Sequence, residues 1–227
     1  MEKKYELTEE SQGIGGVLLS YKANVYRIRA LRDFGDVKKG DLGGFIQKER
    51  NLSQEGDCWV YDISMVYGNA EIRDNAKVSG DSWVFRHACI SGNASVGLDS
   101  RIHGSACVNG NACVSNGCDI GGNSLMTDNA VIYNHVRIGG HVIVRGNAVI
   151  SKWVTIYDYV NVSGSAKIYG GYLYNNTKIS GKSVLYNVNV RGNSNISVDI
   201  ELHGPVSLED VCMTGDFAGG IKQAIFK

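Results

Sequence analysis

Hydrophobic residues recur at every sixth position through the middle of the chain. From Glu55 to Ile168, nineteen consecutive hexads pass without an insertion or a deletion, beginning EGDCWV, YDISMV, YGNAEI and RDNAKV. The sixth position is Val or Ile in every hexad except at Met126, and the fourth is Ala, Ser, Cys or Val. A helix of 3.6 residues per turn would carry these positions around its whole surface, so the period excludes a helix. Small or apolar residues two positions apart, with a mostly polar residue between them, predict short strands with one buried face.

A second period groups the hexads in threes. In every third hexad the fourth position is Ala, or Cys at the start, and the third position reads Asp57, Asn75, Asn93, Asn111, Asn129, Asn147 and Ser165. The repeat is therefore 18 residues long, with three strands and three corners, and Gly beside Asn or Asp supplies the corners. This pattern predicts an all-β, single-stranded parallel β-helix of triangular coils. The asparagine column is predicted to form a hydrogen-bonded ladder along the stack.

The two ends of the chain depart from the period. Residues 1–54 are predicted to be an N-terminal β cap, because the open end of a solenoid exposes unpaired strands. Residues 55–202 form the predicted solenoid, which is regular to 168 and then slips in register, with inward positions spaced by six and five residues. Residues 203–227 are predicted to be a C-terminal cap or tail, with a short tail from Asp216.

Charge and composition narrow the classes of function. Lys plus Arg and Asp plus Glu number 23 each, so the chain has no net field to attract nucleic acid. No apolar run has the length of a membrane span, and the first residues lack the apolar segment of a signal peptide, so we expect a cytoplasmic protein. The six cysteines form no CxxC pair, and we expect no metal site.

Two segments near the start resemble a known family. The stretch from Ala30 to Ile46, ALRDFGDVKKGDLGGFI, and the stretch NLSQEGDCWVYD from Asn51 are similar to the segment that leads into the first coil of the YdcK-like β-solenoid proteins. The resemblance implies a left-handed β-helix akin to the hexapeptide acyltransferases. It also implies an origin in bacteria or their phages, and an acetyltransferase activity that is assigned from the fold.

An acyltransferase of this class is expected to use a histidine as general base, in a cleft between subunits, with an acyl-CoA along the coils. The candidates lie at outward or corner positions: His87, His103, His135 and His141. His103 precedes Gly104 and His141 follows a pair of glycines, where a ligand could approach the backbone, so these two are the predicted catalytic candidates. Cys89 and Cys107 share an outward column on adjacent coils, which we interpret as stacked small side chains.

The outer surface carries apolar residues that predict an interface. Val131 and Val149 are expected to stack on one face and Leu125 and Ile143 on another, with aromatic side chains clustered near them. The predicted subunit or partner interface comprises Leu125, Val131, Ile143, Val149, Trp153, Tyr157 and Tyr159.

Two functions are compatible with these features. The uninterrupted coils, the predicted interface and the lack of a catalytic constellation favour a non-enzymatic β-solenoid scaffold or protein-binding module, homo-oligomeric and without a cofactor. A phage or mobile-element protein that acts on a host protein is one version of this, and it rests on the resemblance alone. The alternative is an acyl-CoA-dependent acyltransferase of the hexapeptide-repeat class, with acetyl-CoA as its substrate. A long loop that would build a pocket is absent from residues 55–168, which weighs against the enzyme.

Overall fold

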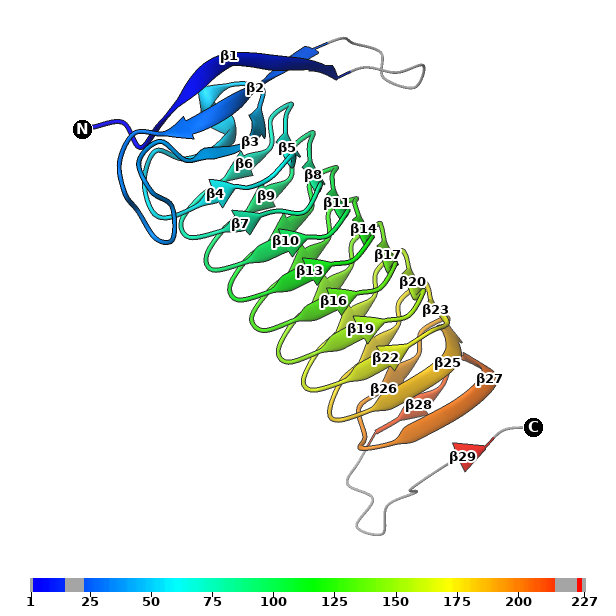
Figure 1. The fold of residues 1–227 in the computed structure, drawn as a ribbon. Coiled ribbons are helices and arrows are strands. Elements are labelled where there is room, and N and C mark those ends of the chain that lie inside the picture. The colour runs from blue at the N-terminus through cyan, green and yellow to red at the C-terminus, as the bar shows by residue number, and fades with distance from the viewer. Residues whose placement is uncertain (1, 15–22, 215–223, 226–227) are drawn as a thin grey trace.

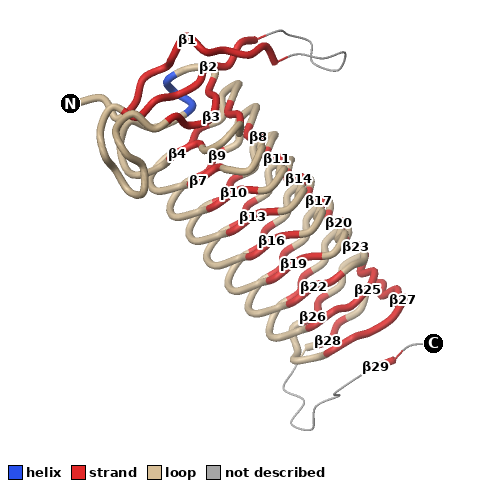
Figure 2. Tube along the Cα trace, in the orientation of Figure 1, coloured by secondary structure: helices blue, strands red, loops and turns tan. Residues whose placement is uncertain are grey.

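The hexads of the sequence form strands of two or three residues that are separated by tight corners. The computed structural model describes residues 2–14, 23–214 and 224–225. Each coil passes through three strands and returns beside its start, so the coils stack along one axis as a β-solenoid (Figure 1). The one helical element among the described residues is the short 3-10 turn η1 (Glu49–Asn51; Figure 2). The predicted all-β fold of parallel 18-residue coils is confirmed.

Three walls of parallel strands enclose the core. The first wall consists of β4 (Trp59–Val60), β7 (Lys77–Val78), β10 (Ser95–Gly97), β13 (Cys113–Ser115), β16 (Val131–Tyr133), β19 (Val149–Ser151), β22 (Lys167–Tyr169), β25 (Val184–Arg191) and β27 (Glu201–Glu209). The second wall consists of β5 (Met65–Val66), β8 (Trp83–Val84), β11 (Arg101–Ile102), β14 (Asp119–Ile120), β17 (Arg137–Ile138), β20 (Thr155–Ile156) and β23 (Tyr172–Leu173), and it continues through the second halves of β25 and β27. The third wall consists of β6 (Glu71–Ile72), β9 (Cys89–Ile90), β12 (Cys107–Val108), β15 (Leu125–Met126), β18 (Ile143–Val144), β21 (Asn161–Val162), β24 (Lys178–Ile179), β26 (Asn195–Ile196) and β28 (Cys212–Met213).

The core is a continuous column of small and branched side chains. Val108, Val114 and Ile120 come from the three walls of one coil, and all three are fully buried, as is Ala112. Each buried Val or Ile stabilises the fold by about 1.5–3 kcal/mol. Because each coil contacts mainly its neighbours, these contributions add nearly independently along the stack.

The corner between the third and first walls carries the asparagine ladder. The side-chain amide of each residue donates to the amide oxygen of the next at 3.0–3.1 Å, in the order Asn75, Asn93, Asn111, Asn129 and Asn147. Glycines precede three of these residues. Gly92 has a φ of +66°, and a Cβ on it would lie 2.9 Å from the backbone nitrogen of Gly110 in the next coil. Close stacking of the coils therefore requires glycine there.

The N-terminal residues fold back over the first coil. Strands β1 (Tyr5–Ile14), β2 (Ala23–Ala30) and β3 (Leu42–Ile46) form an antiparallel sheet, and β3 pairs in parallel with β5. Figure 1 shows β1 and β2 across one end of the stack. The buried Lys4 ammonium donates to the backbone carbonyls of Glu55, Gly56 and Cys58 at 3.0–3.3 Å. It thereby satisfies acceptors that a preceding coil would otherwise bond.

The coil shortens by one residue toward the C-terminus. Partners in the regular ladder are 18 residues apart, whereas Asn176 bonds to Asn193, 17 residues on. The shortening falls in the corner before β23, at the glycines Gly170 and Gly171. Strand β29 (Ala224–Ile225) pairs in parallel with β27, and the rest of the tail predicted from Asp216 lies outside the described residues. Among the described residues, no helix has the length and hydrophobicity that crossing a membrane requires.

Candidate active site

The residue after each second-wall strand forms a column at the corner with the third wall. From the N-terminal end this corner column reads Tyr67, Phe85, His103, Gly121, Gly139, Tyr157 and Tyr174. The ring of Phe85 stacks on Tyr67 at 5.1 Å and on His103 at 5.3 Å. The two glycines interrupt the aromatic column. The ring of His103 occupies the space beside Gly121, and the ring of Tyr157 the space beside Gly139.

The imidazole of His103 is held on three sides. Its Nε2 lies 3.0 Å from Oδ1 of Asp119, one coil further on. Phe85 covers one face of the ring, and on the opposite side a Cβ at Gly121 would lie only 2.3 Å from Cε1 of His103. The side chain is nevertheless 30% exposed. When Nε2–H donates to the carboxylate, Nδ1 is the ring nitrogen that can accept a proton from a substrate, since it makes no hydrogen bond within the described residues.

Two arginines flank Asp119 on the second wall. Asp119 on β14 is in register with Arg101 on β11 and with Arg137 on β17, so the three side chains project from the same face. The hydrogen bond from His103 lowers the pKa of Asp119, and the charges of the two arginines act in the same direction. Both arginines are exposed, and Arg101 lies over the ring of Trp83 at 5.4 Å. The site therefore combines an oriented imidazole with two guanidinium groups that suit phosphate.

The other predicted candidate, His141, has a different environment. Its ring is exposed and stacks on Tyr159 at 5.0 Å, with 3° between the ring planes. Within the described chain it has no carboxylate partner. His135 stacks on Trp153 at 4.4 Å, and His87 borders a depression on the third wall. Of the histidines singled out from the sequence, His103 thus has the partner that orients a general base.

A second histidine–carboxylate pair lies near the C-terminal end. Nε2 of His203 is 2.6 Å from Oε1 of Glu201, and the imidazole stacks on Tyr186 at 4.5 Å. This pair was not predicted from the sequence, because the period of six dissolves from His203 onward. The signal that could have found it is the spacing of two residues on one strand, which places both side chains on the same face.

The residues of the predicted interface are divided between two walls and two corners. Val131 and Val149 lie on the first wall, whereas Leu125 and Ile143 lie on the third. Trp153 lies at the corner between the first and second walls, and Tyr157 and Tyr159 lie at the corner between the second and third. The two aliphatic pairs thus stack on separate walls as expected, and the assignment of these residues to an interface stays a prediction.

Asp119, Arg101 and Arg137 were not predicted as site residues. Their signal was present in the outward position of the second-wall hexads, where the sequence reads Trp83, Arg101, Asp119 and Arg137 at intervals of 18 residues. Opposite charges that alternate at this interval indicate side chains that become neighbours when the coils stack. His103 joins this group from the corner.

Comparison with known proteins identifies a partial relative. No protein-family model matches the chain. Over 83 residues, which are 35% of this chain, it is 40% identical to a protein of Escherichia coli (strain K12) named "Uncharacterized acetyltransferase YdcK". The aligned part spans only 26% of that relative's length.

This relative corrects the expected function. The non-enzymatic scaffold or protein-binding module favoured by the sequence is contradicted, because the relative is named an acetyltransferase, and that favours the acyltransferase alternative. The expectation failed because it required a pocket-building loop or a catalytic motif in the sequence. The His103–Asp119 pair instead comes from adjacent coils, 16 residues apart. The resemblance to the YdcK-like β-solenoid proteins is confirmed over the aligned part of the chain.

Proposed function

We propose that this protein is an acyl-CoA-dependent acyltransferase of the hexapeptide-repeat class, with His103 as its general base. The observation that carries the proposal is the 3.0 Å hydrogen bond between His103 Nε2 and Asp119 Oδ1, on an imidazole that is still accessible. A base oriented by a carboxylate is the arrangement that activates a hydroxyl or amine nucleophile. The name of the partial relative supports the same class of reaction.

The chemistry assigned to the pair is the removal of one proton. Nδ1 of His103 accepts the proton of an acceptor hydroxyl or amine as that group attacks the thioester carbonyl. The tetrahedral intermediate then releases the thiolate of CoA, which takes up the proton from the imidazolium and leaves as the free thiol. Asp119 keeps the imidazole in one orientation and stabilises its positive charge during transfer. A positioned general base of this kind contributes about 10²–10⁴-fold to the rate.

Arg101 and Arg137 are assigned to the anionic part of the acyl-CoA. Their guanidinium groups flank Asp119 on adjacent strands, and their exposure leaves them accessible to phosphate oxygens. Arginine pairs with phosphate through two parallel hydrogen bonds, whereas lysine acts as a point charge. We therefore expect Arg137→Gln to weaken binding of CoA more than Arg137→Lys does.

We further propose that a second copy of the chain covers the second wall. Of the large hydrophobic side chains exposed in the described part of the chain, all but Leu42 on strand β3 lie on this wall or at its two corners: Ile63, Leu98, Trp153, Tyr157, Tyr159 and Tyr172. Apolar surface gathered around one face favours a subunit contact. A second copy against this face would also convert the open His103 site into a cleft, which is the usual form of a substrate site.

The deciding experiment measures binding and turnover separately. Calorimetric titration with acetyl-CoA and CoA gives the affinity, light scattering gives the mass, and release of free CoA thiol with a panel of hydroxyl and amine acceptors gives turnover. We expect His103→Ala to retain binding and to lose about 10²–10⁴-fold in turnover. His141→Ala and His203→Ala serve as matched controls that retain turnover. If the unmodified protein gives no heat of binding and releases no CoA, the acyltransferase proposal is refuted. If only His203→Ala loses turnover, the site moves to the pair of His203 and Glu201.

A further inference from the structure

Cys89 and Cys107 face each other across adjacent strands of the third wall. They are register partners on β9 and β12, both are half-buried, and both are free thiols. Neighbouring parallel strands lie about 4.8 Å apart, within the range of about 4.4–6.8 Å between Cα atoms that a disulfide spans. The two thiols are close enough for each to shift the pKa of the other. The spacing of the two strands is therefore compatible with a disulfide between these residues.

The surroundings of this pair favour its ionised form. The hydrogen bond from Cys89 lowers the pKa of Cys107 to about 6, aided by the amide of Asn109 at 3.6 Å and by the charge of Arg73. The same contact, together with burial, raises the pKa of Cys89. The two thiols thus share one proton at neutral pH, and one thiolate is available for attack.

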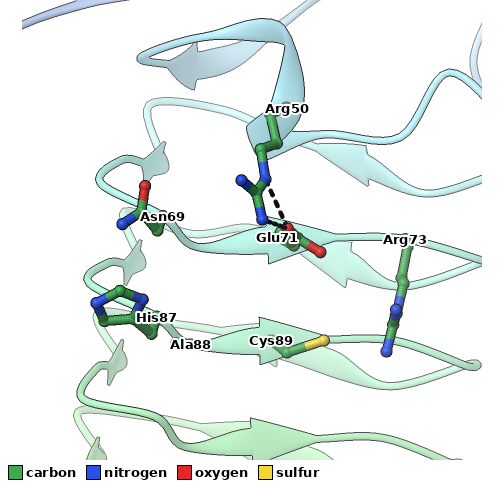
Figure 3. A pocket seen from close by; sticks show the side chains of 7 residues that line it. All are labelled: Arg50, Asn69, Glu71, Arg73, His87, Ala88 and Cys89. Carbon is green, nitrogen blue, oxygen red and sulfur yellow. Dashed lines mark hydrogen bonds and ion pairs between the residues drawn. The ribbon is translucent and has the colours of Figure 1, made fainter.

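A depression of about 480 Å³ opens on the third wall beside Cys89. It is lined by Arg50, Asn69, Glu71, Arg73, His87, Ala88 and Cys89 (Figure 3). Arg50 is held by Glu71 at 2.8 Å, whereas Arg73 forms no ion pair with any described residue. Figure 3 shows the sulfur of Cys89 directed toward Arg73. The depression thus places an unpaired guanidinium and an imidazole beside the thiol pair, which suits a small ligand with carboxylates.

We propose that Cys89 and Cys107 are a thiol–disulfide pair, and that the depression admits a small anionic disulfide of the glutathione class as its oxidant. The single thiolate of the pair attacks one sulfur of glutathione disulfide, and a glutathione thiolate leaves. The remaining protein thiol loses its proton to solvent and attacks the protein sulfur of the mixed disulfide, which releases the second glutathione thiolate. Starting from its singly ionised form, the protein pair loses two electrons and its one remaining proton, and the two glutathione thiolates that leave take up protons from solvent.

The test is a redox titration that is independent of acyl transfer. The reduced protein is equilibrated in buffers of varied ratio of glutathione to glutathione disulfide, its free thiols are trapped with iodoacetamide, and the peptides are analysed by mass spectrometry. We expect Cys89 and Cys107 to lose alkylation together, to appear as a linked peptide, and to recover with dithiothreitol. Full alkylation of both at every ratio would overturn the proposal, as would stable glutathione adducts on each cysteine without a link.

Three variants test the thiol pair and the depression separately. Cys113 is also half-buried on an outward strand position, but its register partners are Ser95 and Val131, so Cys113→Ser is the matched control and should leave the titration unchanged. Cys89→Ser should trap glutathione on Cys107, because Cys107 supplies the attacking thiolate and the resolving thiol is lost. Arg73→Gln should slow oxidation by glutathione disulfide by about threefold at low salt. An unchanged rate would refute the role of the depression, and a titration shifted by Cys113→Ser would refute the pair.

Discussion

Replacing Gly121 with alanine should displace the proposed general base without disturbing the coil. The new Cβ would lie 2.3 Å from Cε1 of His103 and 2.8 Å from Nδ1, closer than nonbonded atoms can approach. Gly121 does not adopt a positive φ, so its backbone accepts alanine. The ring of Phe85 covers the opposite face of the imidazole. The imidazole must therefore move outward, away from the carboxylate of Asp119.

The expected effects on stability and on catalysis differ in size. The lost hydrogen bond joins two partly exposed side chains, so its contribution to the free energy of unfolding is about 0.5–1 kcal/mol. In a chain of this length that loss lowers Tm by about 2–4 °C at most. A misplaced base loses part of the 10²–10⁴-fold that general base catalysis contributes, and we expect kcat to fall by about 10²-fold.

The assay compares Gly121→Ala with Gly139→Ala. A Cβ at Gly139 would lie 2.6 Å from Cε1 of Tyr157, so the second variant makes the same chemical change one coil further along and leaves His103 in place. CoA release with the best acceptor gives kcat, and a thermal melt gives Tm. Unchanged kcat in Gly121→Ala, or an equal loss in both variants, would refute the reasoning that the His103–Asp119 geometry performs catalysis.

Three further predictions concern the ladder, the core and the thiol pair. Asn111→Ala removes two ladder bonds and should lower the free energy of unfolding in urea by about 1–2 kcal/mol. Asn147→Ala removes one and should cost about half as much, so equal losses would contradict the ladder. Val114→Asp buries a carboxylate without a partner and should abolish the single cooperative melt, and retention of that melt would count against a dry core. Because the pKa of Cys107 is lowered to about 6, its alkylation by iodoacetamide should rise through that pH and level off by about pH 7, whereas a continued rise to pH 8 or 9 would indicate an ordinary thiol.

The interior of this protein could be predicted from the sequence by itself. The period of six places Val114 and its equivalents inside, and the period of 18 aligns Asn75 with Asn93 on the next coil. Both predictions succeed because the length of the sequence repeat equals the length of one coil. An inward position stays inward, and a corner residue meets its equivalent one repeat later. The same reasoning located the pair of Cys89 and Cys107 on one wall.

The candidate site depended on the tertiary structure. His103 and Asp119 occupy different positions in their hexads, at a corner and on a wall, so neither period aligns them. Their contact depends on the direction of the His103 side chain, which is determined by the ring of Phe85 on one side and the missing side chain of Gly121 on the other. The exposed apolar face likewise depended on the tertiary structure, because Leu98, Trp153 and Tyr172 come from different coils and gather only when the coils stack. A repeat specifies which residues lie inside and which stack on their equivalents. Contacts between residues at different positions of the repeat are decided only when the coils pack, because the corner side chains then fill the space that their neighbours leave.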